Sequence, residues 1–210
     1  MTRVRDYMEQ TTIIPVMVIN DLDGVEELAH CLADNGLTVL EITLRTELGI
    51  KAVEKIKATY PDMIVGTGTN VCNRDLNRSM DAGADFMVSP GAPRDMLDYA
   101  SQKDLPILPG VATASEVMQA LASGFTELKL FPAQAVGGTA LLKSWAGPLP
   151  QATFCPTGGI NASNASNYLA LPNVLCIGGS WMLDKELISN KNWSALEQKL
   201  IQMNTELNLL

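Results

Sequence analysis

The sequence predicts an α/β fold built from repeated strand-helix units, and two observations support this. Short apolar runs alternate with longer segments of helical periodicity from one end of the chain to the other. The starts of successive runs lie 20 to 26 residues apart, which leaves room for one strand and one helix each time. The eight runs are IIPVMVI (13–19), TVLEIT (38–43), MIVGT (63–67), DFMVS (85–89), PILPG (106–110), TELKLF (126–131), ATFCPT (152–157) and NVLCIGG (173–179).

The segments between these runs carry helix signals. Residues 24–34 place apolar side chains on one helical stripe. Residues 73–81 begin with Asn73, which we expect to cap that helix, and residues 114–122 follow a capping Thr113. Glycine is the residue that most often ends a helix. Pairs that end in glycine stand where the helices should stop, at Asn35-Gly36, Ala82-Gly83 and Ser123-Gly124.

Eight consecutive units leave two main topologies, a closed (β/α)₈ barrel or a doubly wound open sheet. Eight is the number of units in a TIM barrel, so the closed barrel is favoured. No break in composition marks a linker, and we therefore expect one domain that spans residues 1–210. In a barrel the glycine-rich strand ends VGTGT, LPGVAT, PTGGI and IGGS would all lie at one mouth.

Composition excludes several classes of protein. The chain is 47% apolar and 18% charged, which is typical of a globular protein and not of a disordered one. Fifteen basic residues against 23 acidic ones give a net charge of −8 without a basic cluster, so we expect no nucleic-acid partner. The charge-free stretch 144–183 is interrupted by Gly, Pro and Asn and predicts no membrane helix. Residues 1–20 do not read as a signal peptide, and the four cysteines are widely spaced, so we expect reduced thiols in a cytoplasmic protein.

Glu41 is the first candidate catalytic residue. In TVLEITLR the alternation places Val39, Glu41 and Thr43 on one side of the strand and only apolar residues on the other. The apolar side should face the helices, so Glu41 points into the barrel near its mouth. Burial there would suit a carboxyl group to proton transfer near neutral pH. The alternative is a structural glutamate in an ion pair of the core.

Lys129 is the second candidate, because TELKLF repeats the same alternation. Glu127, Lys129 and Phe131 share the inward side, and burial of a lysine there is costly. A buried amine that is neutral for part of the time can attack a carbonyl carbon and form a Schiff base. The alternative is a register shifted by one residue, in which Lys129 reaches solvent. Since the strands of Lys129 and Glu41 are well separated in order, the two side chains must meet across the barrel.

Two glycine pairs end the last two strands, Gly158-Gly159 and Gly178-Gly179, and Ser180 follows the second pair. Backbone N–H groups left open by glycine, beside a helix N-terminus, form a phosphate-binding cradle. In barrels this is the usual position of a phosphate site. Tight turns that bind no ligand are the alternative.

Other cofactor signals are missing from the sequence. Gly66 and Gly68 lack the third glycine of a dinucleotide-binding fingerprint, and no phosphate-binding GxxxxGK[ST] motif occurs. The single histidine, His30, falls within a predicted helix, so we expect no catalytic metal and a surface or packing role for His30.

The strings VLEITLRT, IVGTGT, SPG, LPGVAT, ELKLFPA, FCPTGGI and VLCIGGSW occur in order across nearly the whole chain. Together they closely resemble the 2-keto-3-deoxy-6-phosphogluconate (KDPG) and 4-hydroxy-2-oxoglutarate (KHG) aldolases. This resemblance implies a metal-free class I aldolase with a (β/α)₈ fold, no cofactor other than a covalent imine, and a homotrimer.

The resemblance also implies roles for individual residues. Lys129 matches the Schiff-base lysine and Glu41 the general acid/base, in agreement with the analysis of the two strands. Arg45 and Thr69, with Pro90 nearby, would hold the carboxylate of pyruvate, and Phe131 would pack beside the imine. The phosphate of the substrate would be bound by Thr157, Gly158, Gly159, Gly178, Gly179 and Ser180.

The implied reaction is the cleavage of KDPG to pyruvate and glyceraldehyde 3-phosphate, a step of the Entner-Doudoroff pathway. The same pyruvate site could serve KHG, which yields pyruvate and glyoxylate. Two alternatives remain at this point: an aldolase for the galactonate epimer, and a sugar-phosphate sensor without catalysis. The sequence does not decide between KDPG and KHG as the substrate used in the cell.

Overall fold

The computed structural model of the chain describes residues 4–207. The described part contains nine strands and ten helices, and every strand pairing within it is parallel. The strands are β1 (Ile13–Met17), β2 (Val39–Thr43), β3 (Ile64–Gly68), β4 (Phe86–Val88), β5 (Ile107–Leu108), β6 (Gly110–Val111), β7 (Glu127–Leu130), β8 (Thr153–Pro156) and β9 (Ile177–Gly179). The helices are α1 (Val4–Met8), α2 (Val25–Asp34), α3 (Leu48–Thr59), α4 (Asn73–Asp81), α5 (Arg94–Gln102), α6 (Ala114–Ala122), α7 (Gly138–Ala146), α8 (Ala165–Leu169), α9 (Lys185–Ser189) and α10 (Trp193–Glu206).

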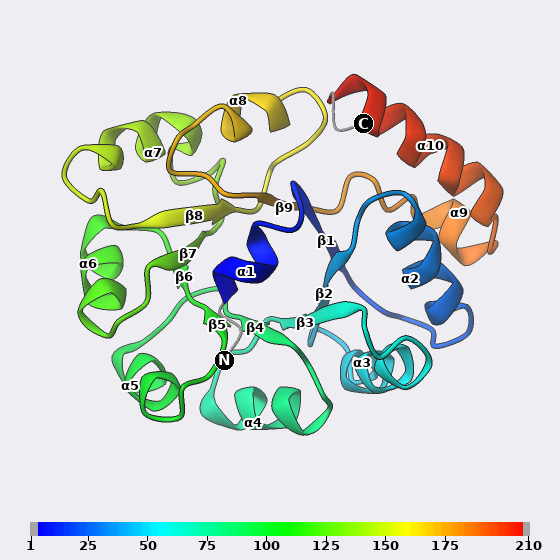
Figure 1. Cartoon of the computed structure of the whole chain (residues 1–210), viewed down its shortest axis with the longest axis horizontal. Helices are drawn as coiled ribbons and strands as arrows, with labels where there is room; N and C mark the ends of the chain where they lie inside the picture. The colour runs from blue at the N-terminus through cyan, green and yellow to red at the C-terminus, as the bar shows by residue number, and fades with distance from the viewer. Residues whose placement is uncertain (1–3, 208–210) are drawn as a thin grey trace.

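The strands form a curled parallel sheet with the helices α2 to α10 arranged around its outside (Figure 1). Six strands follow the order β5-β4-β3-β2-β1-β9, and three more follow the order β6-β7-β8. The alternation of strands and helices predicted from the sequence is therefore confirmed. Parallel neighbours require such crossover helices, because a parallel strand cannot be reached by a tight turn.

The predicted fifth strand, 106–110, is divided in two by Pro109. Proline has no N–H group to donate to the sheet, and the strand is interrupted there. Before the interruption β5 pairs with β4, and after it β6 pairs with β7. The Pro109 carbonyl still accepts a hydrogen bond from the N–H of Lys129 at 2.9 Å. On this side, the two sections of sheet thus meet at Pro109.

The predicted eighth strand is shorter than expected, because β9 begins only at Ile177. Two isolated parallel bridges join β8 and the residue after it to this segment, Phe154 with Val174 and Thr157 with Gly178, and there is no continuous ladder. The observed sheet is therefore curled and nearly continuous, and its two sections touch at Pro109 and at these bridges.

Two hydrophobic clusters cover the two faces of the curled sheet. The larger one includes Leu40 and Ile42 of β2 and Leu128 of β7 together with residues of the outer helices. The smaller one lies on the inner face and includes Val39, Phe86 and Cys155. Leu40 and Ile42 thus join one cluster and Val39 the other, as the alternation predicted for the second strand requires.

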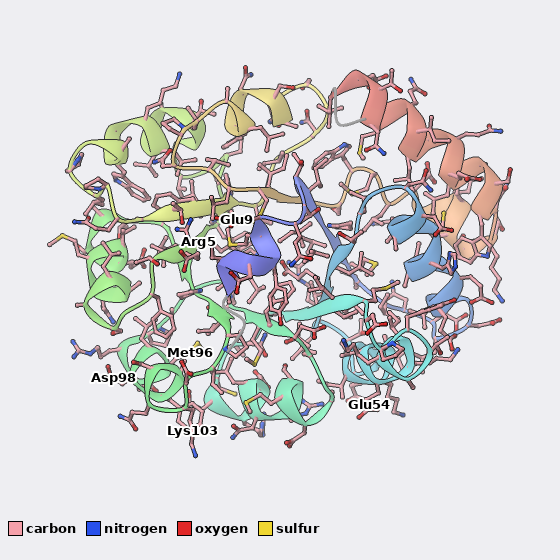
Figure 2. All side chains as sticks on the ribbon, viewed as in Figure 1. Arg5, Glu9, Glu54, Met96, Asp98 and Lys103 are labelled. Carbon is pink, nitrogen blue, oxygen red and sulfur yellow. The ribbon has the colours of Figure 1, made fainter. Side chains whose placement is uncertain are left out.

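The first helix was not predicted. α1 lies over the middle of the ring of strands in Figure 1, and its Val4 and Met8 belong to the inner cluster. Arg5 binds Glu127, the first residue of β7, with the Arg5 Nε 2.8 Å from Glu127 Oε1, and Figure 2 labels Arg5 on this helix. Because Glu127 starts its strand, α1 covers the end of the sheet where the strands begin.

The helix caps agree with the sequence in part. Thr113 caps α6 in a reciprocal capping box with Glu116, as expected. Asn73 is the first residue of α4 and not its cap, which is Cys72, so the prediction for Asn73 was wrong. No described side chain caps the first N–H groups of α4, and Asp75 in its first turn instead accepts the N–H of Val71, which precedes the helix, at 3.1 Å. No described helix is long and apolar enough to cross a membrane.

Candidate active site

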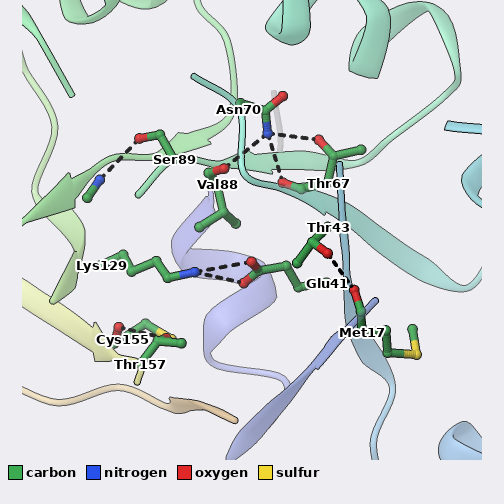
Figure 3. A network of polar contacts seen from close by, with 11 residues as sticks. Met17, Glu41, Thr43, Thr67, Asn70, Val88, Ser89, Lys129, Cys155 and Thr157 are labelled. Carbon is green, nitrogen blue, oxygen red and sulfur yellow. Dashed lines mark hydrogen bonds and ion pairs between the residues drawn. The ribbon is translucent and has the colours of Figure 1, made fainter. Parts of the chain in front are cut away.

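Lys129 and Glu41 form a buried ion pair inside the curled sheet. Lys129 lies on β7 and Glu41 on β2, and the Lys129 Nζ is 3.1 Å from Glu41 Oε1 and 3.3 Å from Oε2 (Figure 3). The two residues are 5% and 3% exposed. The prediction that both side chains point inward and meet is confirmed, and the alternative in which Lys129 reaches solvent is wrong. The alternative of an ion pair in the core describes the resting geometry, and it is compatible with catalysis.

Gly68 at the end of β3 leaves space for the Glu41 carboxylate. A methyl group added at Gly68 would overlap Glu41 Oε1. β3 pairs with β2 so that Gly68 lies opposite Thr43, one inward position beyond Glu41. The carboxylate therefore occupies the volume that any other side chain at position 68 would take.

Arg45 and Thr69 follow the ends of the neighbouring strands β2 and β3. Arg45 is exposed and makes no hydrogen bond or ion pair with another described residue. Thr69 has a backbone φ of +64°, which is unusual for a β-branched residue and costs about 1–3 kcal/mol. Neither the N–H nor the hydroxyl group of Thr69 bonds to another part of the described chain. Since Thr43 pairs with Gly68, both residues lie at the same edge of the sheet.

Pro90 and Phe131 complete this end of the site. Pro90 follows β4, and a methyl group at Gly110 would overlap the Pro90 backbone, so the two chain segments are in close contact. Phe131 follows β7, and its ring centroid lies 5.4 Å from the Lys129 Nζ. This distance allows a cation-π interaction with an ammonium or an iminium group. The expectation that Phe131 packs beside the lysine nitrogen agrees with this geometry.

The two glycine pairs lie next to each other in space. Thr157 forms the isolated bridge with Gly178, and the Thr157 side chain fills the space that a side chain at position 178 would need. Gly158 and Gly159 have φ values of +98° and +78°, which glycine adopts without strain. The N–H groups of Gly159 and Ser180 donate to no other described residue. Two free amides at adjacent strand ends suit an anion such as a phosphate.

The helix N-termini expected beside this cradle are further along the chain. α8 begins at Ala165, after a turn in which Asn164 Oδ1 accepts the N–H of Asn161 at 2.9 Å. α9 begins at Lys185 and is capped by Asp184. The amides that follow the strands directly therefore belong to loops, and the helices begin a few residues later along the chain.

His30 has the surface role predicted for it. It is exposed on α2, and its Nδ1 lies 2.6 Å from Asp34 Oδ2. Among residues 4–207, no group of three or more His, Cys, Asp or Glu side chains could hold a metal ion.

Sequence reasoning missed two features of the site, Gly68 and the buried Asn70. Gly68 belongs to the glycine-rich strand end VGTGT, and a glycine at an inward position beside the Glu41 strand is a signal for a close approach of another group. Asn70 carried the signal of a polar residue in a tight turn after a buried strand. Its hydrogen-bond partners lie partly on α4 and β4, which are separate elements, so the local sequence gives no signal for them.

The comparisons with known proteins point to one family. The family described as KDPG and KHG aldolase matches residues 4–199. The 2-dehydro-3-deoxy-phosphogluconate aldolase of Pseudomonas aeruginosa is 41% identical over 196 residues, which cover 93% of this chain and 89% of that protein. The KHG/KDPG aldolase of Escherichia coli K12 is 42% identical over 187 residues, which cover 89% of this chain and 88% of that protein.

A solved structure is also similar over nearly the whole chain. It is the KDPG aldolase of Legionella pneumophila, with pyruvate captured at low pH as a covalent carbinolamine intermediate. Its TM-score is 0.92 and its sequence identity 43%, and the match covers 96% of this chain and 98% of that one. The matched residues, the relatives and the shared fold together show that this chain belongs to the KDPG and KHG aldolase family.

Proposed function

We propose that this chain is a class I aldolase that cleaves KDPG to pyruvate and glyceraldehyde 3-phosphate through an imine on Lys129. The observation that carries the proposal is the contact of 3.1 Å between the Lys129 Nζ and Glu41 Oε1 in a buried site. It unites a nucleophile with an acid/base group, as imine chemistry requires. The KDPG aldolase names of the relatives and the carbinolamine in the Legionella pneumophila neighbour support the same reaction.

The first half of the reaction forms the imine. A proton moves from the Lys129 ammonium along its hydrogen bond to Glu41, and the neutral amine attacks the C2 carbonyl carbon of the substrate. The resulting carbinolamine loses its hydroxyl group as water, with the proton supplied by Glu41 directly or through a water molecule. The protonated imine that remains can accept the electron pair of the bond that breaks next.

The second half breaks the C3–C4 bond. Glu41, again a carboxylate, takes the proton of the C4 hydroxyl group, the electron pair of the C3–C4 bond moves toward the iminium, and glyceraldehyde 3-phosphate leaves. The enamine of pyruvate is then protonated at C3, and water hydrolyses the imine to release pyruvate. Phe131 beside the Lys129 nitrogen favours the cationic intermediate.

The remaining site residues position the substrate in this proposal. Arg45 and Thr69, with Pro90 nearby, hold the carboxylate of pyruvate so that C2 lies within reach of Lys129. Thr157 and Ser180, with the two glycine pairs, bind the phosphate at the far end of KDPG. A phosphate site favours KDPG as the main substrate, and the name of the Escherichia coli relative supports KHG as a second one.

We further propose that the curled sheet is a closed (β/α)₈ barrel of one domain over residues 1–210. The bridges of Phe154 to Val174 and of Thr157 to Gly178, and the shared Pro109 between β5 and β6, support continuous closure. We also propose a homotrimer in the cytoplasm. The charge-free segment 161–171, which includes α8, suits a contact between subunits, and light scattering of the purified protein tests its mass.

Reductive trapping tests the proposed function. The protein is incubated with pyruvate and sodium borohydride, and its intact mass and peptide map are measured. A reduced pyruvate adduct on Lys129 is expected. An absence of adduct, or an adduct on another lysine, would contradict the mechanism and favour a sugar-phosphate sensor.

Two lysine variants sharpen this experiment. Lys129→Met removes the amine while keeping the length of the side chain, and no adduct is expected. Lys57→Met is the matched control, because Lys57 is also largely buried in an ion pair, 2.9 Å from Asp85 Oδ2, and should leave the adduct on Lys129 unchanged. Assays of the folded wild type with KDPG, its galactonate epimer and KHG then rank the substrates.

A further inference from the structure

A buried network of hydrogen bonds surrounds the chain on both sides of Thr69, at the end of β3. Its members are Thr67, Asn70, Ser79 and the carbonyl of Val88, and the three side chains are fully buried. The Thr67 hydroxyl donates to Ser79 Oγ at 2.7 Å, and the Ser79 hydroxyl donates to Asn70 Oδ1 at 2.9 Å. Figure 3 shows Asn70 between Thr67 and Val88, beside the end of β3.

Asn70 is the centre of this network. Its Nδ2 group donates to the Val88 carbonyl at 3.0 Å, to the Thr67 carbonyl at 3.0 Å and to the Thr67 hydroxyl at 3.1 Å. Its backbone N–H donates to the same Val88 carbonyl at 3.1 Å. The side chain thus ties the loop after β3 to β4 and, through Ser79, to α4. All of these partners are groups of the protein itself. The Asn70 side chain therefore has no direct part in the proposed reaction, and its hydrogen bonds need another explanation.

The conformation of the neighbouring residue, Thr69, explains what these hydrogen bonds of Asn70 can do. Thr69 lies between Gly68 and Asn70 and has the strained φ of +64°. A β-branched residue keeps that conformation only where its surroundings impose it. The bonds of Asn70 to Thr67 and Val88 fix the backbone on both sides of Thr69. The N–H and hydroxyl groups of Thr69, in turn, have no partner in the described chain.

We infer that Asn70 is a positioning residue for recognition of the substrate carboxylate. Its carboxamide holds Thr69 in the left-handed conformation, and the free donors of Thr69 are thereby presented to the carboxylate at the pyruvate end of the substrate. This inference rests on the proposed function, since it assigns the pyruvate carboxylate to Thr69 and Arg45. Preorganised donors bind an anion better than flexible ones because no ordering is required on binding.

The test compares pyruvate with methyl pyruvate, which has the same ketone but no carboxylate charge. For each compound, the concentration that gives half-maximal borohydride trapping on Lys129 is measured in the wild type and in Asn70→Ala. We expect Asn70→Ala to raise the half-saturating pyruvate concentration about tenfold or more, because small displacements of positioning groups are costly. Methyl pyruvate should be affected much less, so the preference for pyruvate falls. Lys129 should still be modified at high pyruvate.

The matched control is Asn204→Ala. Asn204 is a buried asparagine of α10 whose Nδ2 donates to the Asn35 carbonyl at 2.9 Å, remote in sequence from every site residue. It should lower thermal stability without changing the preference for pyruvate over its ester. A purely structural role for Asn70 predicts the same result for Asn70→Ala, and that result would overturn the inference.

A second variant keeps the test decisive if Asn70→Ala does not fold. Ser79→Ala removes only the hydroxyl that donates to Asn70 Oδ1, and we expect a smaller loss of the same preference. An unchanged preference in a folded Ser79→Ala protein would then overturn the inference. Absence of any adduct on wild-type Lys129 is a different outcome, because it refutes the proposed function itself and the inference with it.

Discussion

At the scale of single residues, the buried contact between Lys129 and Glu41 explains why two charges are kept in an apolar interior. Each charge alone would be strongly disfavoured there, and each compensates the other across 3.1 Å. A structural ion pair of this kind could be replaced by apolar residues without harm to the fold. A catalytic pair could not be replaced without loss of turnover, which makes substitution of one partner informative.

Glu41→Gln keeps the shape of the side chain and a hydrogen bond to Lys129, but it removes the proton-transfer group. We expect kcat/KM for KDPG to fall by about 10²–10⁴-fold, which is the usual contribution of a general acid/base. Glu54→Gln, on the outer face of α3 and labelled in Figure 2, is the control and should leave kinetics unchanged. Wild-type turnover by a folded Glu41→Gln protein would remove Glu41 from the mechanism.

Gly68→Ala tests whether the space beside Glu41 matters. The added methyl group would overlap the Glu41 carboxylate, so we expect the carboxylate to move away from Lys129 and kcat to fall about tenfold or more. Gly147→Ala is the control, because nothing lies within 4 Å of its added methyl group and its φ is not positive. Steady-state kinetics and circular dichroism of both variants separate lost activity from lost folding.

At the scale of elements, the helices are held by local bonds that the sequence signals in part. Asp184 caps α9 by accepting the N–H of Glu186 at 3.0 Å, and it also binds Lys199 of α10 at 2.7 Å. The Lys199 ammonium, together with the backbone N–H of Leu187, lowers the pKa of Asp184. The two last helices are therefore linked through one ionised carboxylate.

This link predicts a pH dependence. Because the pKa of Asp184 is lower in the folded chain, its ionised form stabilises the fold at neutral pH, and this contribution is lost as the pH falls below the unfolded value of about 3.9. Asp184→Asn keeps a capping oxygen but not the charge. Its melting temperature should lie below that of the wild type at pH 7, and the difference should shrink in acid. Asp62→Asn, at an exposed residue, should show no such difference, and a gap that persists in acid would contradict the explanation.

At the scale of the whole molecule, the curled sheet and its helices bury polar as well as apolar groups. Cys155 and Cys176 both belong to the inner cluster. A hydrogen bond to Cys155 and complete burial raise the pKa of the Cys176 thiol well above its ordinary value. Burial likewise raises the pKa of Cys31. The Cys176 and Cys31 thiols should therefore remain protonated and unreactive in the folded protein.

Thiol labelling tests this protection. Of the four cysteines, only Cys72 is partly exposed, and we expect it to react with a chromogenic disulfide reagent before the others. All four should react once denaturant unfolds the chain. Cys72→Ser is the control and should abolish the fast phase without changing the slow one. Rapid reaction of Cys155 or Cys176 in the folded protein would show that the sheet opens to solvent.

The sequence by itself determined the order of strands and helices, the inward direction of Glu41 and Lys129, and the position of the glycine pairs at the ends of the last two strands. These features follow from local periodicity and turn chemistry. The sequence did not determine that α1 covers one end of the sheet, that Pro109 divides a strand or that Cys72 caps α4. Only the tertiary structure decided how closely Glu41 approaches Lys129, how Gly68 makes room for it and how Asn70 holds Thr69. These contacts join residues from separate strands and helices, and parallel pairing of distant segments has no local signal in the chain.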